Sequence, residues 1–156
     1  MFRSSRPSEN KLRPVWQAGI ADHVIGLSWA PLGRHLAAAA VSGPVTVFDA
    51  NTGKPDCQLK GHGFGTDAVA WQPNGRVLAT AGQDGKMKLW DVVAGTEVLA
   101  LDGGAAWVEQ LAWNASGTLL AAAAGKKTRV WDASGNLVRE LPQQAGTVTD
   151  LAWRPG

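Results

Sequence analysis

Three residue types that often cooperate in catalysis occur in the middle of the chain: His62, Thr80 and Asp84. A histidine oriented by a carboxylate can activate a hydroxyl group as a nucleophile, as in Ser-His-Asp hydrolases. The same side chains can instead form a buried structural chain of hydrogen bonds, which needs no exposed attacking group. We favour the structural role and predict no catalytic residues.

Other patterns that could bind a ligand are better explained as loops. The glycine-rich stretch 61–65 could be a phosphate loop, but such a loop should open a helix, and a strand pattern follows here. Residues 125–128 (Gly-Lys-Lys-Thr) are similar to the end of a nucleotide-binding P-loop, yet Leu120 stands where its first glycine belongs. Cys57 and the three histidines match no zinc-ligand spacing. We therefore predict no metal site and no cofactor.

The elements that must position these residues repeat along the chain. A phrase with a central tryptophan returns at steps of 42, 42 and 40 residues, at Trp29, Trp71, Trp113 and Trp153. A second phrase, an aromatic residue followed by aspartate, keeps nearly the same spacing at Phe48, Trp90 and Trp131. A period of this length indicates one supersecondary unit used repeatedly. Six of the eight tryptophans belong to these two series, so we expect them to be architectural.

Each unit is predicted to contain four short strands separated by turns. In the second unit the turn at 72–75 and the Asp84-Gly85 pair are strong turn signals, because glycine readily adopts positive φ angles. Four antiparallel strands in about 40 residues is the size of one propeller blade. The predicted strands are 24–29, 35–40, 45–48 and 56–59, then 66–71, 77–81, 87–90 and 97–101, then 108–113, 119–123, 128–131 and 137–141, flanked by single strands at 15–18 and 148–153.

The repeated motifs resemble those of the WD-repeat β-propeller family. The second unit carries the full pattern, at Gly61-His62, at 71–75, at Asp84-Gly85 and at Trp90-Asp91. The resemblance implies an all-β fold, namely a partial WD-repeat β-propeller of three four-stranded antiparallel blades plus flanking single strands. We expect a flexible N-terminal segment at 1–13 and a propeller segment at 14–156, with units at roughly 19–60, 61–102 and 103–144 and a partial unit at 145–156.

The resemblance also implies a structural hydrogen-bond relay within a blade, formed here by His62, Thr80, Asp84 and Trp90. A buried indole N–H needs an acceptor, and a hydroxyl, an imidazole and a carboxylate can satisfy one another in turn. The other two units lack this set. The corresponding residues are Ile20, Ala38, Ser42 and Phe48 in the first unit, and Gly104, Ala122 and Trp131 in the third. We expect those two blades to depend on apolar packing.

The number of units predicts an incomplete ring. Closed propellers need at least about four blades, and this sequence holds three units and a fraction. We therefore expect a fragment of a larger propeller, and a truncated, non-functional gene product is the alternative. An open arc exposes apolar faces and unpaired strand edges, so self-association through these edges is also expected.

Composition limits the partners and the compartment. The formal net charge is +2 and the basic residues are scattered except near the N-terminus and at Lys126-Lys127, which argues against a nucleic-acid partner. No apolar run is long enough to span a membrane, and the polar N-terminus is unlike a secretory signal. Cys57 is the single cysteine, so no internal disulfide can form. A cytoplasmic location is the simplest expectation.

These observations favour a non-catalytic scaffold that binds protein partners of unknown identity. Loops at one rim of the blades are the expected contact surface, and their residues are Phe64, Gln83, Trp107 and Lys127. An exposed loop tryptophan is a candidate binding hot spot, although Trp107 could also pack against the neighbouring blade. The alternative from another class is a propeller enzyme or ligand-binding domain with its site in the central channel.

Overall fold

The computed structural model describes residues 13–104 and 107–154. These residues contain twelve β-strands and no helix, arranged as three four-stranded sheets. The first sheet contains β1 (Val24–Trp29), β2 (His35–Ala40), β3 (Val45–Asp49) and β4 (Pro55–Leu59). The second contains β5 (Thr66–Trp71), β6 (Val77–Gly82), β7 (Lys86–Asp91) and β8 (Thr96–Asp102). The third contains β9 (Val108–Trp113), β10 (Leu119–Ala124), β11 (Lys127–Asp132) and β12 (Leu137–Glu140).

Each sheet is a simple antiparallel meander, in which every strand pairs with the next along the chain. The turns that divide the strands are those expected from the sequence. Gly75 and Gly85 have φ angles of 75° and 72°, and their amides donate to the carbonyls of Gln72 and Gly82 at 2.8 and 3.2 Å. The predicted bounds of the twelve strands differ from the observed ones by at most one residue at either end.

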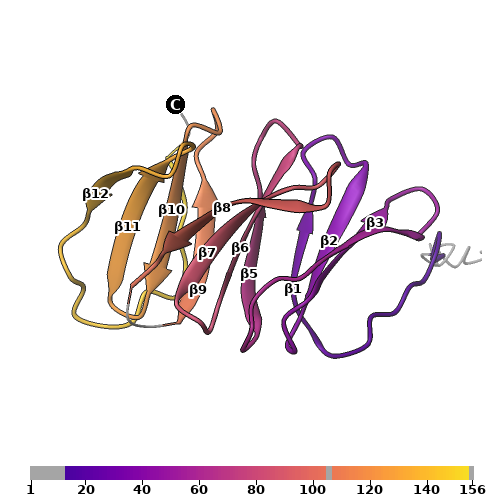
Figure 1. Cartoon of the computed structure of the whole chain (residues 1–156), viewed down its shortest axis with the longest axis horizontal. Helices are drawn as coiled ribbons and strands as arrows, with labels where there is room; N and C mark the ends of the chain where they lie inside the picture. The colour runs from indigo at the N-terminus through magenta and orange to yellow at the C-terminus, as the bar shows by residue number, and fades with distance from the viewer. Residues whose placement is uncertain (1–12, 105–106, 155–156) are drawn as a thin grey trace, which may run out of the picture.

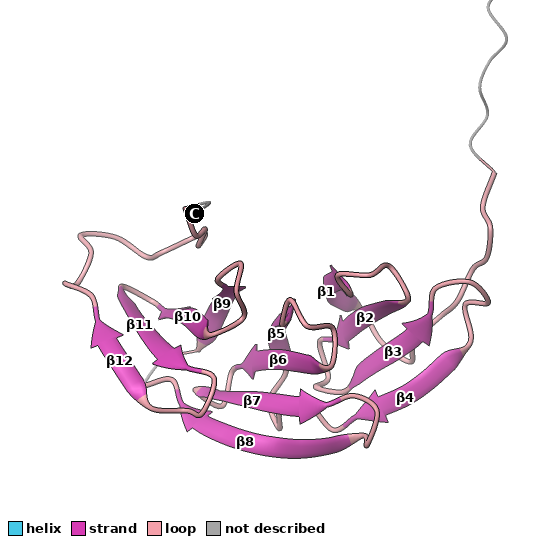
Figure 2. Cartoon of the chain, turned by 90° about the horizontal axis from the view of Figure 1, so that it is seen from above, coloured by secondary structure: helices cyan, strands magenta, loops and turns pink. Residues whose placement is uncertain are grey.

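The three sheets stand side by side as the blades of an open arc (Figures 1 and 2). We name them blade 1, blade 2 and blade 3 in chain order. Figure 2 shows the first strand of each blade (β1, β5 and β9) on the concave side and the last strand (β4, β8 and β12) on the convex side. The all-β fold of three four-stranded antiparallel blades is therefore confirmed.

The core lies between the blades. Between blades 1 and 2, buried Ala37, Val47 and Leu59 pack in one cluster with Leu78 and Trp90. Between blades 2 and 3, a second cluster contains Ala79, Leu89, Leu101, Leu120 and Trp131. The alanines of β2, β6 and β10 let neighbouring sheets approach closely, and the bulkier side chains fill the remaining space.

The two flanking segments differ from the prediction of single strands. Residues 15–18 and 148–153 belong to no sheet. A strand is stabilised by hydrogen bonds to a neighbouring strand, and the middle strands that would lie beside these two segments are absent from the described residues. Each segment is instead attached to the nearest blade by isolated contacts. The Trp16 indole donates to the carbonyl oxygen of Ala50 at 2.6 Å, and its ring stacks on Phe48 at 6.3 Å.

The predicted units contain one sheet each. Strands β1 to β4 fall within 19–60, β5 to β8 within 61–102, and β9 to β12 within 103–144. The predicted flexible segment 1–13 lies outside the described residues except for Arg13. Over the described ranges, no helix has the length and apolarity that crossing a membrane requires.

Candidate functional site

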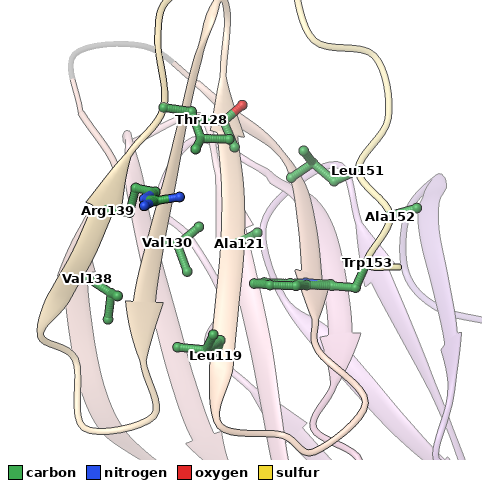
Figure 3. A pocket seen from close by; sticks show the side chains of 10 residues that line it. Leu119, Ala121, Thr128, Val130, Val138, Arg139, Leu151, Ala152 and Trp153 are labelled. Atoms are coloured by element: carbon green, nitrogen blue, oxygen red, sulfur yellow. The ribbon is translucent and has the colours of Figure 1, made fainter. Parts of the chain in front are cut away.

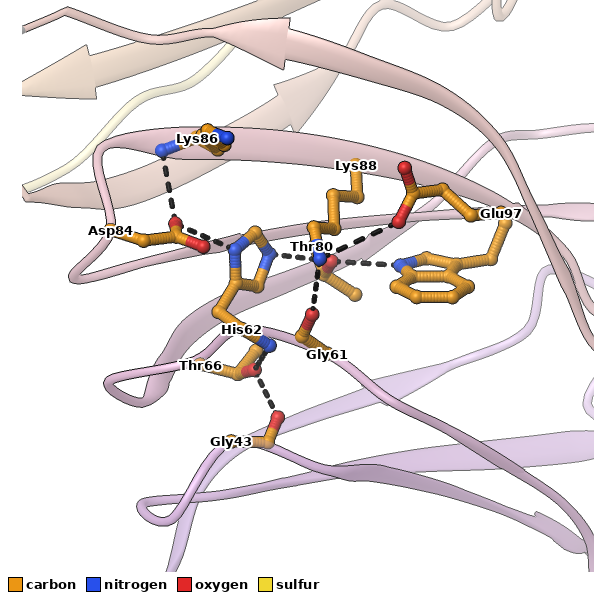
Figure 4. A network of polar contacts seen from close by, with 10 residues as sticks. Gly43, Gly61, His62, Thr66, Thr80, Asp84, Lys86, Lys88 and Glu97 are labelled. Atoms are coloured by element: carbon orange, nitrogen blue, oxygen red, sulfur yellow. Dashed lines mark hydrogen bonds and ion pairs between the residues drawn. The ribbon is translucent and has the colours of Figure 1, made fainter.

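The four residues of the predicted relay meet at one end of blade 2. His62 lies in the link between β4 and β5, Thr80 on β6, Asp84 in the turn before β7, and Trp90 on β7. The Trp90 indole N–H donates to Thr80 Oγ1 at 2.9 Å, Thr80 Oγ1 lies 2.8 Å from His62 Nε2, and His62 Nδ1 lies 2.8 Å from Asp84 Oδ1 (Figure 4).

These distances define the direction of each hydrogen bond. Asp84 as a carboxylate can only accept, so His62 donates from Nδ1. Nε2 of a neutral imidazole is then an acceptor for the Thr80 hydroxyl, whose oxygen in turn accepts the indole N–H. Every polar atom along this path has a partner of the correct type when the imidazole is neutral. A second proton on His62 would leave the Thr80 hydroxyl hydrogen without its acceptor.

The surroundings favour this protonation state. Burial lowers the pKa of His62 below its ordinary value of 6.5, and the hydrogen bond to Asp84 opposes that effect without reversing it. Burial also works against ionisation of Asp84, but hydrogen bonds from His62 and the Lys86 backbone N–H lower the pKa of the Asp84 carboxyl overall. The relay is therefore a neutral imidazole beside an ionised carboxylate.

Further contacts connect the relay to the preceding blade. The Lys88 ammonium donates to the Gly61 carbonyl at 2.8 Å, just before His62 in the chain. The His62 backbone N–H donates to Thr66 Oγ1 at 3.3 Å, and the Thr66 hydroxyl donates to the carbonyl oxygen of Gly43 in the β2–β3 turn of blade 1. Figure 4 shows this path from Gly43 to the relay. The network thus ties blade 2 to blade 1 as well as closing blade 2 itself.

The relay has no accessible reacting group. Thr80 is fully buried, and the His62 ring has no exposed surface. A nucleophile must reach a substrate atom at near van der Waals distance, which the packing around Thr80 prevents. The arrangement can therefore order the blade, and it offers no site for hydrolysis.

The predicted contact residues lie at the same end of the blades as the relay. Phe64 and Trp107 occupy the equivalent links β4–β5 and β8–β9, and their side chains are 77% and 55% exposed. Lys127 is also exposed, at the start of β11. Gln83 is only partly exposed, because its side-chain amide donates to Asp67 Oδ1 at 3.3 Å. We name Phe64, Gln83, Trp107 and Lys127 the loop face.

Two features of the structure were not predicted from the sequence. The first is a repeated bond to the preceding blade, made by the tryptophans that end β5 and β9 and by the equivalent Trp153. The indole N–H of each donates to a main-chain carbonyl of the preceding blade, Trp71 to Ser28 at 3.0 Å, Trp113 to Ala70 at 3.3 Å and Trp153 to Ala112 at 2.9 Å. We name this series the tryptophan ladder. The 42-residue period is its signal in the sequence, but the acceptors are backbone atoms.

The second unpredicted feature is Asp67, on the innermost strand of blade 2. Its Oδ2 is buried and has no hydrogen-bond partner. Burial raises the pKa of the Asp67 carboxyl, and the hydrogen bond from Gln83 only partly offsets this. Elsewhere in the described residues, no group of three or more His, Cys, Asp or Glu side chains is arranged to hold a metal ion.

Comparison with known proteins agrees with this geometry. Residues 53–91 and 95–132 match the family model of the WD domain, G-beta repeat. No curated protein matches the chain significantly. Two solved structures are similar. The computationally designed Ika4 protein is 20% identical, with a TM-score of 0.83, and the match covers 93% of this chain and 89% of that chain. A chain of the mitotic checkpoint complex is 28% identical, with a TM-score of 0.79, and the match covers 89% of this chain and 44% of that chain.

The two solved structures contribute differently. The likeness to the designed protein shows the fold alone, and this chain spans less than half the length of the chain in the checkpoint complex. The family match covers most of blades 2 and 3, including the Asp84-Gly85 turn and the two Trp-Asp pairs. Taken with the three stacked meanders and the repeating tryptophans, it shows that the chain belongs to the WD-repeat β-propeller family.

Proposed function

We propose that this chain is a non-catalytic scaffold that binds a protein partner through the loop face. WD repeats are, at the level of the family, protein-interaction scaffolds. The observation that carries the finer proposal is the exposure of Phe64 and Trp107 in equivalent links of adjacent blades. Large aromatic side chains exposed in this way are costly in water and are frequent anchors of protein interfaces.

The rigidity of the scaffold beneath Phe64 supports the proposal. Phe64 is two residues from His62, whose ring is fixed on both sides by the relay. A contact residue on an ordered link loses little conformational entropy on binding. One of the similar solved chains is part of the mitotic checkpoint complex, and membership of a complex agrees with a role in protein association.

We propose that the partner is a cytoplasmic protein and not a nucleic acid. Of the basic side chains near the loop face, Arg129 pairs with Glu140 at 2.7 Å and Lys88 with Glu97 at 3.4 Å. A nucleic-acid site needs a continuous basic face. Because three blades are fewer than a closed propeller requires, we propose further that the arc functions within a larger ring.

Copurification of partners tests the loop face. The tagged chain is compared with Phe64→Ala and Trp107→Ala variants, and bound proteins are identified by mass spectrometry. Leu32→Ala is the matched control, because Leu32 is 75% exposed but lies at the opposite end of blade 1. We expect the two loop variants to lose the same bound proteins and Leu32→Ala to retain them. Unchanged recovery in both loop variants would reject the loop face as the binding surface.

A further inference from the structure

The tryptophan ladder is open at the blade 1 end of the arc. Trp71, Trp113 and Trp153 each donate to the blade before them. Trp29 occupies the equivalent position in blade 1, but no described blade precedes it and its side chain is 56% exposed. Its neighbours Ile25, Leu27 and Leu32 are exposed as well. The innermost strand of blade 1 is therefore an apolar edge with an unused indole donor.

The opposite end of the arc carries the complementary surface. In blades 1 and 2 the face that receives the next blade is built from alanines on the second strand and aliphatic residues on the third and fourth. Blade 3 repeats this pattern at Ala121, at Val130 and, just after β12, at Leu141, where blade 1 has Ala37, Val47 and Leu59. We name this surface the receiving face.

The receiving face of blade 3 is incompletely filled. It forms an apolar groove of about 480 Å³, lined by Leu119, Ala121, Val130 and Val138 and bordered by Leu151 and Trp153. Figure 3 shows the Trp153 ring lying across the groove toward Ala121 and Leu119. At the two complete contacts between blades, the corresponding surface is covered by a whole sheet.

The segment that borders the groove is held by few bonds. Val148 N–H donates to the Gly125 carbonyl at 2.8 Å, and the Trp153 indole donates to the Ala112 carbonyl at 2.9 Å. Residues 148–153 make no strand ladder, and much of this segment is exposed. Trp153 thus makes the tryptophan-ladder contact that a further blade would make, but no sheet in the described part of the chain accompanies it to bury the groove.

We propose that a second copy of this chain docks on the receiving face, with β1 of one copy replacing residues 148–153 at blade 3 of the other. Trp29 then donates to the Ala112 carbonyl in place of Trp153, and the second and third strands of blade 1 cover the groove. The occupant is another copy because the chain carries both halves of the contact, and because the contact continues an interface already repeated between its own blades.

The geometry of the ring supports the same occupant. A head-to-tail contact closes into a ring when the rotation per unit allows it. Two arcs of three blades give six blades, which lies within the range of closed propellers. Both contacts of such a dimer are identical, so each copy uses its Trp29 edge and its receiving face once.

Light scattering and sedimentation of the purified chain test the proposal. We expect a concentration-dependent species of twice the single-chain mass of 16.4 kDa. Trp29→Ala should raise the dimer dissociation constant by at least about tenfold, because it removes a central aromatic anchor. Trp107→Ala is the matched control, since Trp107 is 55% exposed but lies on the loop face, and it should leave the constant unchanged. Circular dichroism verifies that both variants stay folded.

Two further variants test the direction of the contact. Trp153→Ala removes the competing side chain within the same copy and should strengthen the dimer. Ala121→Arg places a charge in the groove and should abolish the dimer. An equimolar mixture of the Ala121→Arg and Trp29→Ala chains should still form a heterodimer, because the Trp29 edge of the first and the receiving face of the second make one intact contact. Three outcomes would each overturn the proposal. The chain could stay monomeric, the dimer could persist in both Trp29→Ala and Ala121→Arg, or the chain could form aggregates that Trp29→Ala does not affect.

Discussion

At the scale of single residues, the contacts of His62 distinguish blade 2 from its neighbours. Thr80 and Trp90 place a hydroxyl and an indole N–H in the interior, where each would be costly without a partner. The neutral imidazole satisfies the hydroxyl and passes the chain of hydrogen bonds on to Asp84, at the blade surface. Blade 3 keeps the indole as Trp131 but has Gly104 and Ala122 where blade 2 has His62 and Thr80, so the relay cannot form there.

Removal of His62 should therefore destabilise the protein. We expect His62→Ala to lower the free energy of unfolding by about 1–3 kcal/mol, because the Thr80 hydroxyl loses a buried acceptor. Thermal or urea unfolding measures the loss. His23→Ala is the control, since the His23 side chain is 90% exposed. Equal losses in the two variants would contradict the role of the relay. Gly104 is no clean comparison, because its φ of 120° makes any side chain strained.

The relay should also make stability depend on pH. Because burial lowers the pKa of His62 in the folded state, the unfolded chain binds more protons as the pH falls below about 6.5, and folding is weakened. The lowered pKa of Asp84 acts in the same direction at more acidic pH. We expect the melting temperature to fall between about pH 7.5 and pH 5.5, and to fall less in His62→Ala. An identical decrease in both proteins would show that other groups are responsible.

At the scale of elements, the links between blades decide how closely the sheets approach. Gly61 lies in the β4–β5 link, just before His62, and has a φ of 62°. A Cβ atom there would overlap the carbonyl oxygen of Gly43 in blade 1. Gly33, in the β1–β2 turn, has nearly the same φ of 67° but open space around it.

This pair separates backbone strain from the close approach of two blades. We expect Gly33→Ala to cost about 1–2 kcal/mol for the left-handed conformation alone. Gly61→Ala should cost at least about 3 kcal/mol, because the backbone of blade 1 must also move. Chemical denaturation of the two variants measures the difference. Similar costs would mean that the contact between Gly61 and Gly43 does not constrain the packing of blades 1 and 2.

The elements also show what could be predicted from the sequence. Alternating strands, the Asp84-Gly85 turn and the 42-residue period located all three sheets, because these signals are local. The flanking segments 15–18 and 148–153 carry the same local signals, but a strand also needs a neighbour to pair with. The tryptophan ladder was missed because its acceptors are main-chain carbonyls, which no side-chain pattern encodes. The orphaned Oδ2 of Asp67 depends on packing around it and has no sequence signal either.

At the scale of the whole molecule, the arc behaves as a one-dimensional stack of blades. Each blade packs only on its immediate neighbours, so stability is close to a sum of blade and interface contributions. Blade 2 has both faces covered, by the clusters shared with blades 1 and 3. Blades 1 and 3 each have one face without a neighbouring sheet in the described arc.

This stacking predicts a gradient of local stability that hydrogen exchange can measure. The amides of Ala37, Ala79 and Ala121 are matched probes, since all three are buried and lie on the second strand of their blades. In the Trp29→Ala chain, where docking of a second copy is disfavoured, Ala79 should exchange most slowly, because opening blade 2 breaks two interfaces and opening an end blade breaks one. The same rate at all three positions would mean that the arc unfolds as a single cooperative unit and that its ends are as well supported as its centre. A faster rate at Ala121 than at Ala37 would follow from the weaker cover on blade 3, where residues 148–153 take the place of a sheet.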